Sequence, residues 1–378
     1  MSVSDFRIDV PDDVLADLRE RIVRTRFTPA SAAQPWEAGT DPGYLRSLLA
    51  YWADGFDWRK AESELNLLPH YTADVAGQRI HFVHIRAARR PDGAGRGPLP
   101  LILTHGWPSS FVEMLPLVPL LTDPARPGGA FDLVIPSLPG FLFSELPPDG
   151  PMTREAVART WHALMTEVLG YPRYGAFGGD IGSAVSGWLG ALHPESVAGI
   201  HTIHPSPPTD LEDLSAAERM FMEAVDAFDE KDRGYSEIMA TRPDTIAAAL
   251  MDSPAGLAAW IVDKYRAWSD CGGDLESRFD RDHLLTVLTL YWATGTIGSS
   301  FRQYYDWGHN PARPPITVPA GVTLSAETLM RDLPRSFAER TFPDLRQWRG
   351  PTVGGHFMAT EEPELLATDL RTFFGSLS

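Results

Sequence analysis

The segment at residues 174–183 places the tightest restriction on how this 378-residue chain can fold. It reads as a short apolar strand that passes through Gly178-Gly179-Asp180-Ile181-Gly182 into a segment with apolar residues at helical spacing. So sharp a strand-to-helix turn needs glycines around the turn residue, because they let the two backbones approach closely. Asp180 is that residue. We therefore predict a nucleophile elbow in which a carboxylate, not a hydroxyl, is raised above the edge of a sheet.

A carboxylate in this position restricts the chemistry. It is a poor nucleophile for acyl transfer, but it attacks an electrophilic sp³ carbon and forms an alkyl ester that water must later hydrolyse. A Gly-Asp-Gly turn with a capping aspartate is the alternative interpretation of the same residues. Partners elsewhere in the chain have to decide between the two.

The segments around the elbow predict an α/β fold. Continuous apolar strands separated by helices are typical of a mostly parallel sheet covered on both faces. The predicted strands lie at residues 101–103, 131–135, 174–178 and 197–201, with a crossover helix at residues 153–169. Further strands are expected at residues 71–75, 79–85, 316–318 and 322–324, and a closing helix at residues 362–374.

Two helical blocks interrupt this pattern. Residues 1–70 carry three amphipathic helices and no strand signal, which predicts an N-terminal helical extension that packs on the core. Residues 210–310 lose strand character and contain four helical segments, which predicts a helical lid inserted into the chain. Residues 71–209 and 311–378 are then the two parts of one α/β core. The Arg-, Gly- and Pro-rich residues 89–100 are expected to be a loop.

Composition excludes several classes of partner. The formal net charge of −17 argues against nucleic acid and anionic membranes, which both need a basic surface. Cys271 is the only cysteine, so neither an intrachain disulfide nor a cysteine metal site is expected. The first 14 residues lack an apolar stretch long enough for a signal or membrane anchor, and we expect a soluble, cytoplasmic protein.

The loop after the predicted strand at residues 101–103 reads His105-Gly106-Trp107-Pro108. In a fold with a nucleophile elbow, this loop supplies one backbone N–H of an oxyanion hole, and the residue after the nucleophile supplies the other. We therefore predict that the amides of Trp107 and Ile181 form the oxyanion hole.

Chain order selects the general base and its acid, because the usual order is nucleophile, acid, histidine. His356 is the only histidine after His309, and it lies in a Gly-Gly-His-Phe segment that can turn its imidazole towards the elbow. Glu327 is the carboxylate nearest the end of the strand at residues 322–324 and is the predicted acid. The competing carboxylates are Asp332, Glu339 and Asp344.

Four other histidines are interpreted as structural. Residues at turns, caps or strand ends have packing roles more often than catalytic ones, and these histidines lack the spacing of metal ligands. They are His105, His193, His201 and His204. We predict no metal and no cofactor.

An epoxide is one electrophile with such an sp³ carbon, and its oxygen needs a hydrogen-bond donor as it becomes an alkoxide. A tyrosine hydroxyl suits that role. The lid offers several candidates, and residue patterns alone do not choose among them. They are Tyr235, Tyr265, Tyr291, Tyr304 and Tyr305.

Taken together, these motifs resemble microsomal-type epoxide hydrolases, a branch of the α/β-hydrolase superfamily. The resemblance runs from the N-terminal helices to the last helix. Its motifs are His105-Gly106-Trp107-Pro108, residues 136–141, Gly178-Gly179-Asp180, residues 234–238, residues 252–257, residues 291–297 and Gly354-Gly355-His356-Phe357.

The resemblance implies a cofactor-independent enzyme that converts an epoxide and water to a vicinal diol through an ester on Asp180. It also implies that Tyr235 and Tyr304 polarise the epoxide, and that Tyr305 is a bystander. The chain departs from the family at Ile181, where tryptophan is common, and around Glu327, where the segment is one residue shorter than usual.

Two other functions compete with this interpretation. A haloalkane dehalogenase shares the aspartate elbow and the histidine base, but it commonly needs an indole next to the nucleophile, which Ile181 cannot supply. A non-catalytic ligand-binding protein on the same fold usually loses a catalytic residue, and none is missing here. The many Trp and Phe residues of the lid suggest a lipophilic, even aromatic, epoxide, from detoxification or from natural-product biosynthesis. The sequence is compatible with a homodimer and does not decide the oligomeric state.

Overall fold

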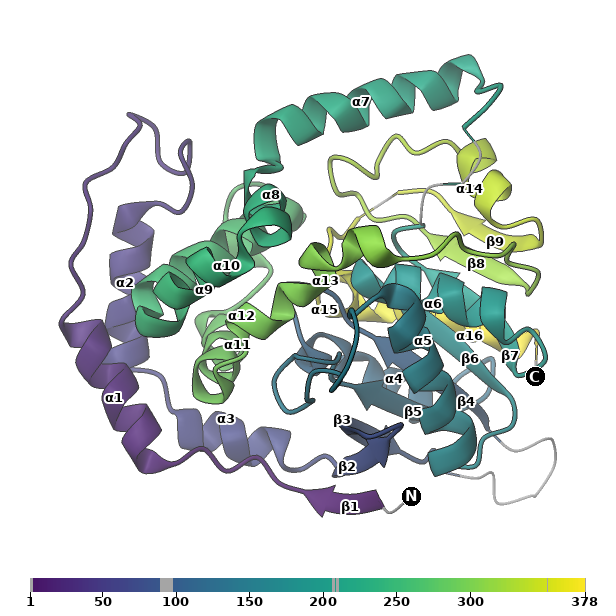
Figure 1. The fold of residues 1–378 in the computed structure, drawn as a ribbon, viewed down its shortest axis with the longest axis horizontal. Helices are drawn as coiled ribbons and strands as arrows, with labels where there is room; N and C mark the ends of the chain where they lie inside the picture. Colours follow the sequence, from purple (N-terminus) through teal and green to yellow (C-terminus); the bar gives the residue numbers. More distant parts are fainter. Residues whose placement is uncertain (1–2, 89–97, 206–207, 209–210, 352, 378) are drawn as a thin grey trace.

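A computed structural model of the chain describes residues 3–88, 98–205, 208, 211–351 and 353–377. In these residues the strands form a single sheet in the order β1-β2-β3-β5-β4-β6-β7-β8-β9 (Figure 1). The strands are β1 (Val3–Phe6), β2 (His70–Val75), β3 (Gln78–Ile85), β4 (Leu99–Thr104), β5 (Phe131–Pro136), β6 (Tyr174–Gly178), β7 (Val197–Thr202), β8 (Ala320–Thr323) and β9 (Leu345–Arg349).

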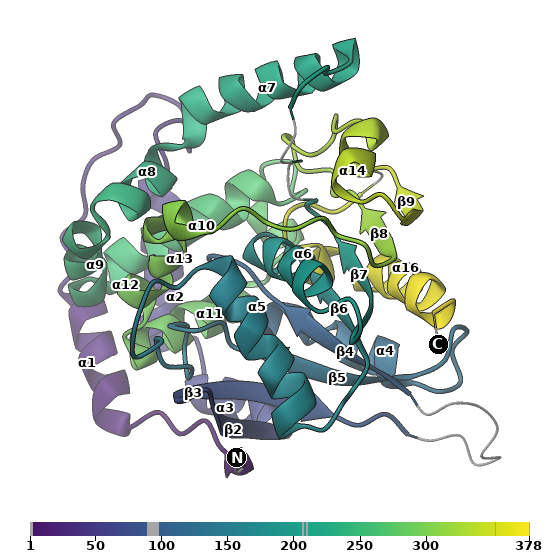
Figure 2. The same cartoon turned by 45° about the vertical axis from the view of Figure 1, so that its right-hand side comes forward.

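The sheet is antiparallel from β1 to β5 and parallel from β5 through β9. Its central strands are buried along their whole length, as their continuous apolar sequence predicts. Helices α5 (Arg154–Ala163) and α6 (Ile181–Leu192) cover one face, while α4 (Leu117–Thr122) and α16 (Pro363–Gly375) cover the other (Figures 1 and 2). The predicted α/β-hydrolase fold is therefore confirmed.

The edges of the sheet differ from the prediction. Strand β1 pairs antiparallel with β2, although no strand was expected before the N-terminal helices. Residues 316–318 are not a strand, because prolines flank them and Ile316 and Val318 are buried outside the sheet. The last strand is instead β9, a partly exposed edge strand whose charged residues hid its signal. Residues 89–97 of the predicted loop lie outside the described residues, and Leu99 and Pro100 belong to β4.

The N-terminal helices are α1 (Asp12–Val23), α2 (Pro42–Asp54) and α3 (Trp58–Leu65). They were expected to pack on the core, but much of their packing is against the lid. The Trp52 indole N–H donates to Thr289 Oγ1 at 3.0 Å, and Thr40 Oγ1 donates to the Ala259 carbonyl at 2.7 Å. In Figure 1 this purple segment runs along the outer side of the green lid helices.

The lid joins β7 to β8. Its helices are α7 (Ala216–Asp232), α8 (Gly234–Thr241), α9 (Pro243–Asp252), α10 (Pro254–Trp268), α11 (Arg281–Thr294), α12 (Ile297–Ser300) and α13 (Arg302–Tyr305). The other helical segments are short: η1 (Phe111–Met114), the π-helical η2 (Leu164–Val168), η3 (Leu275–Ser277), η4 (Trp307–His309), α14 (Arg335–Thr341) and α15 (Met358–Glu361).

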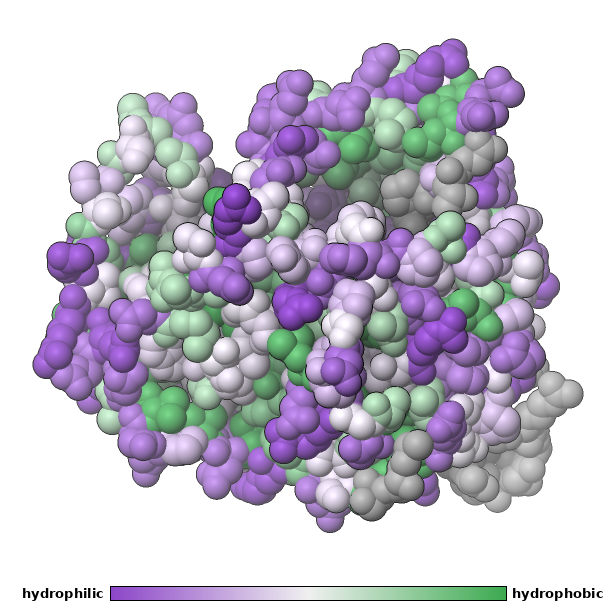
Figure 3. All heavy atoms as spheres, in the orientation of Figure 1, coloured by the Kyte–Doolittle hydropathy of each residue, from purple (hydrophilic) through white to green (hydrophobic). Residues whose placement is uncertain are grey.

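Helix α7 lies at the outer rim of the molecule, where Phe221 packs against Phe337 of α14, and the face in Figure 3 is mostly hydrophilic with apolar side chains gathered beside this helix. No single helix among the described residues has the length and apolar character needed to cross a membrane. Helices α9 and α10 reach them only as a pair, and the pair is bent by 117°.

Candidate active site

The predicted elbow is present. Strand β6 ends at Gly178, and α6 begins at Ile181, so Asp180 occupies the turn with φ 51° and ψ −123°. A residue with a side chain is strained in this region, at a cost of about 1–3 kcal/mol. A Cβ atom on Gly182 would lie 2.0 Å from the Thr104 carbonyl oxygen, so only glycine lets helix and strand approach this closely.

The loop after β4 holds the carboxylate of Asp180. The Trp107 backbone N–H donates to Asp180 Oδ1 at 3.1 Å. A Cβ atom on Gly106 would lie 2.4 Å from the Asp180 Cβ, which explains why glycine precedes Trp107. Ile181 is the first residue of α6, where a helix leaves its N–H groups without intrahelical partners. Its part in an oxyanion hole stays a prediction.

His356 and Glu327 lie beside this carboxylate, although they are far from it in sequence. His356 Nδ1 is 2.9 Å from Glu327 Oε2, and its Nε2 is 3.7 Å from Asp180 Oδ2. Glu327 follows β8, and His356 follows β9 and donates its backbone N–H to the Trp268 carbonyl of α10. The fold therefore brings together the nucleophile, acid and base that chain order predicts.

The carboxylates that competed with Glu327 lie elsewhere. Glu339 forms an ion pair with Arg335, Asp344 forms one with Arg346, and Asp332 is exposed. None of these three is hydrogen bonded to His356 in the described part of the chain.

The charges of the neighbouring side chains set the protonation of His356 and Glu327. Burial lowers the pKa of His356, but the carboxylates of Glu327, Asp180 and Glu113 outweigh burial and raise it to about 9. Burial raises the pKa of Glu327, but the charge of His356 and hydrogen bonds from His204 and His356 hold it below the usual range. At neutral pH the resting site therefore contains an imidazolium between two carboxylates.

The two tyrosines implied by the family resemblance lie over the Trp107 ring. Tyr235, on α8, stacks on Trp107 with ring centroids 5.6 Å apart, and Tyr304, on α13, packs edge-on at 5.8 Å. Burial raises the pKa of each hydroxyl, and the negative charge of Asp180 raises both further. Both hydroxyls are therefore protonated and able to donate a hydrogen bond near the carboxylate.

The other lid tyrosines have different surroundings. Tyr265 stacks on Phe357 with centroids 4.2 Å apart, and the Tyr291 hydroxyl donates to the Ser109 carbonyl at 2.8 Å. Tyr305 is 49% exposed. These contacts favour Tyr235 and Tyr304 over their neighbours.

One residue of the site was interpreted as merely structural from the sequence. His204 Nδ1 accepts the Asp180 backbone N–H at 3.1 Å, and His204 Nε2 is 3.1 Å from Glu327 Oε2. Its position was a usable signal, because it lies just beyond the carboxyl end of β7, next to the elbow strand, where ligand sites of parallel sheets form.

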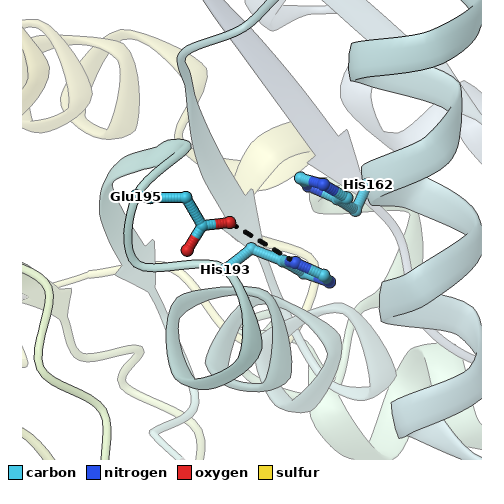
Figure 4. Close-up of side chains that lie close together, drawn as sticks. All are labelled: His162, His193 and Glu195. Atoms are coloured by element: carbon cyan, nitrogen blue, oxygen red, sulfur yellow. Dashed lines mark ion pairs between the residues drawn. The ribbon is translucent and has the colours of Figure 1, made fainter.

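A second histidine cluster lies at the far end of α5 and α6 (Figure 4). His162 and His193 stack face to face with ring centroids 3.6 Å apart and an angle of 2°, and Glu195 Oε1 is 3.8 Å from His193 Nδ1. A metal ion lies in the plane of an imidazole ligand, along its nitrogen lone pair, whereas stacked rings direct their lone pairs in parallel planes. This arrangement therefore fits packing of neutral rings better than a shared metal.

Comparison with known proteins agrees with this geometry. The family described as "Epoxide hydrolase N terminus" matches residues 3–114, and "alpha/beta hydrolase fold" matches residues 100–234. Epoxide hydrolase 1 of Sus scrofa is 34% identical over 414 residues, which is 100% of this chain and 89% of that protein.

Two solved structures are similar over the whole chain. Juvenile hormone epoxide hydrolase from the silkworm Bombyx mori has a TM-score of 0.90 at 28% identity, covering 100% of this chain and 95% of that one. Aspergillus niger epoxide hydrolase has a TM-score of 0.84 at 31% identity, covering 100% and 97%. With full-length likeness in both sequence and structure, the chain belongs to the epoxide hydrolase family and is an enzyme of the α/β-hydrolase fold.

Proposed function

We propose that the enzyme converts a lipophilic epoxide to a vicinal diol through a covalent ester on Asp180. The observation that carries this proposal is that the two oxygens of the carboxylate have different partners. Oδ1 accepts the Trp107 N–H at 3.1 Å, while Oδ2 is directed towards His356 at 3.7 Å. Oδ2 is therefore the attacking atom, and Oδ1 becomes the carbonyl oxygen of the ester.

The first step opens the ring. Asp180 Oδ2 forms a bond to an epoxide carbon as the C–O bond of the ring breaks, and the ring oxygen takes a proton from a tyrosine hydroxyl. Tyr235 and Tyr304 are suited to this donation because both hydroxyls are buried and protonated. Donors fixed where negative charge develops are the strongest electrostatic aid to such a step.

The second step breaks the ester. Ester formation removes the negative charge of Asp180, one of the charges that raise the pKa of His356, so the imidazole gives up its proton more readily. That proton passes to the tyrosinate left by ring opening and restores the tyrosine hydroxyl. Neutral His356 then takes a proton from water as that water attacks the ester carbonyl carbon. Oδ1 carries the resulting negative charge beside the Trp107 N–H. Collapse breaks the bond from the carbonyl carbon to Oδ2, and the leaving alkoxide takes the proton of the new hydroxyl, which releases the diol, regenerates the carboxylate and leaves His356 protonated as at the start.

The aromatic side chains around Trp107 favour a lipophilic substrate. Trp268 and Phe301 pack against Trp107, with centroids at 6.1 and 6.2 Å, beside the two tyrosines. Such aromatic surroundings bind apolar groups, while the only hydroxyls required are those of the two tyrosines. A haloalkane dehalogenase is the weaker alternative, because Ile181 provides no indole for a halide. A binding protein without activity has no use for an assembled nucleophile, acid and base.

A single turnover in ¹⁸O-labelled water tests the mechanism, with enzyme in excess over styrene oxide. Attack by Asp180 predicts unlabelled diol and label in the peptide that contains Asp180, because water enters at the ester carbonyl. Label found only in the diol would mean that Asp180 deprotonates a water instead. The matched variant His356→Gln is expected to accumulate the ester, seen in the intact protein as a mass increase equal to that of the epoxide.

A further inference from the structure

His204 connects two parts of the site, Asp180 and Glu327, which come from distant segments of the chain. It follows β7 and is 8% exposed. Its Nδ1 accepts the backbone N–H of Asp180, and its Nε2 lies 3.1 Å from Glu327 Oε2 and 3.3 Å from Ser325 Oγ. Its ring also stacks on that of His356, with centroids 4.5 Å apart.

These contacts assign the tautomer of His204. A backbone N–H can only donate, so Nδ1 must carry a lone pair, and the proton of the neutral ring is on Nε2. Nε2–H therefore faces both Glu327 Oε2 at 3.1 Å and Ser325 Oγ at 3.3 Å, and the carboxylate is the stronger acceptor because it is closer and charged. The same carboxylate oxygen, Oε2, accepts from His356 Nδ1 at 2.9 Å, so two imidazoles share one acceptor atom.

We propose that His204 is a positioning residue, which fixes Glu327 for its contact with His356 and holds the strained backbone of the nucleophile. This inference rests on the proposed function, in which His356 is the base for ester hydrolysis. One ring satisfies a buried carboxylate and an amide at the turn at the same time, so the orientation of the acid and that of the elbow are set together.

The effect on catalysis follows from charge. The donor on His204 spreads the negative charge of Glu327, and without it that carboxylate binds the proton of His356 more strongly. The groups that face His356 are Glu327 after β8, Asp180 at the start of α6, Glu113 in η1 and His204 itself. Of these, only the His204 donor opposes protonation of His356, and it does so through Glu327.

Two substitutions separate the two contacts of His204. The side-chain nitrogen of glutamine occupies the position of imidazole Nε2, so His204→Gln keeps the donor to Glu327. The side-chain oxygen of asparagine occupies the position of Nδ1, so His204→Asn keeps the acceptor for the Asp180 N–H and loses the donor. His204→Leu removes both.

The experiment measures the rate of ester hydrolysis in single turnovers with styrene oxide as a function of pH, using intact mass to follow the ester. In His204→Asn and His204→Leu we expect the apparent pKa of hydrolysis to rise by about one unit, with hydrolysis about tenfold slower at neutral pH. Alkylation is expected to change much less, so the ester accumulates. His204→Gln is expected to restore the wild-type pH profile.

A matched control is His201→Leu, which removes a histidine that is fully buried on β7 and has no hydrogen bond to Glu327 or His356 in the described residues. It should leave the pH profile unchanged. The proposal is overturned if His204→Asn keeps the wild-type profile, or if the control shifts it equally.

A second measurement does not depend on turnover. The pKa of His356 in the resting protein, followed by ¹⁵N NMR, should rise in His204→Asn relative to wild type. An unchanged value refutes the role of His204 even if ester formation is confirmed. If the wild type forms no ester, but the pKa of His356 rises in His204→Asn as expected, the proposed function alone is refuted.

Discussion

Asp180→Asn isolates the charge that the ester removes. Asparagine keeps the size of the side chain and, like the ester, has no negative charge. Asp180 Oδ2 is 3.7 Å from His356 Nε2 in a partly exposed site, where the Asp180 side chain is 25% exposed. Coulomb's law then gives about 1 kcal/mol with the dielectric constant of water and about 4 kcal/mol with an effective value near 20. Those energies correspond to a change of about 1–3 pKa units.

The pKa of His356 is raised to about 9 in the resting enzyme, so we expect a value nearer neutrality in Asp180→Asn. The assay is a pH titration of ¹⁵N-labelled histidine by NMR, with the His356→Gln spectrum used to assign the resonance. Asp344→Asn is the control, because that carboxylate pairs with Arg346 on the surface. A pKa of His356 that is unchanged or higher in Asp180→Asn would refute the argument that alkylation releases the base.

Three further predictions use the same site. Tyr235→Phe and Tyr304→Phe should each slow alkylation by about 100-fold, and the double variant should nearly abolish it; normal single-turnover rates in all three would contradict the assignment. Glu327→Gln should slow ester hydrolysis while Asp332→Asn leaves it unchanged, and the opposite pattern would mean that the acid is misplaced. Because the folded pKa of His356 is raised, its proton stabilises the fold fully below pH of about 6.5. That contribution is lost as the pH rises towards about 9, so the difference in free energy of unfolding between wild type and His356→Gln should narrow over this range, and a widening difference in chemical denaturation would disprove it.

The sequence alone predicts the parts of the site that local pattern and chain order control. Glycines around Asp180 predict the turn, because the backbones of the helix and the strands nearly touch there. His356 is predicted as the base because no other histidine follows His309. Glu327 follows from its distance to the end of a strand. These inferences need no knowledge of side-chain contacts.

Contacts between distant segments are harder to predict from the sequence. His204 looks like an ordinary strand-end residue until the sheet places it beside β6, since its partners are 24 and 123 positions away in sequence. Strand β1 is short and largely exposed, so it lacks the apolar pattern of a strand and exists because β2 offers an edge to pair with. Pairing partners of this kind are set by the tertiary structure, not by the local sequence.

The N-terminal segment also restrains two helices of the lid. It is fastened at one end by β1 on the sheet and along its length to α10 and α11, through Thr40 and Trp52. Lifting those two helices away from the sheet would break these hydrogen bonds and expose the apolar faces beneath them. The segment thus works as a strap that makes α10 and α11 a fixed wall of the site, and it keeps Trp268, the last residue of α10, in place against Trp107.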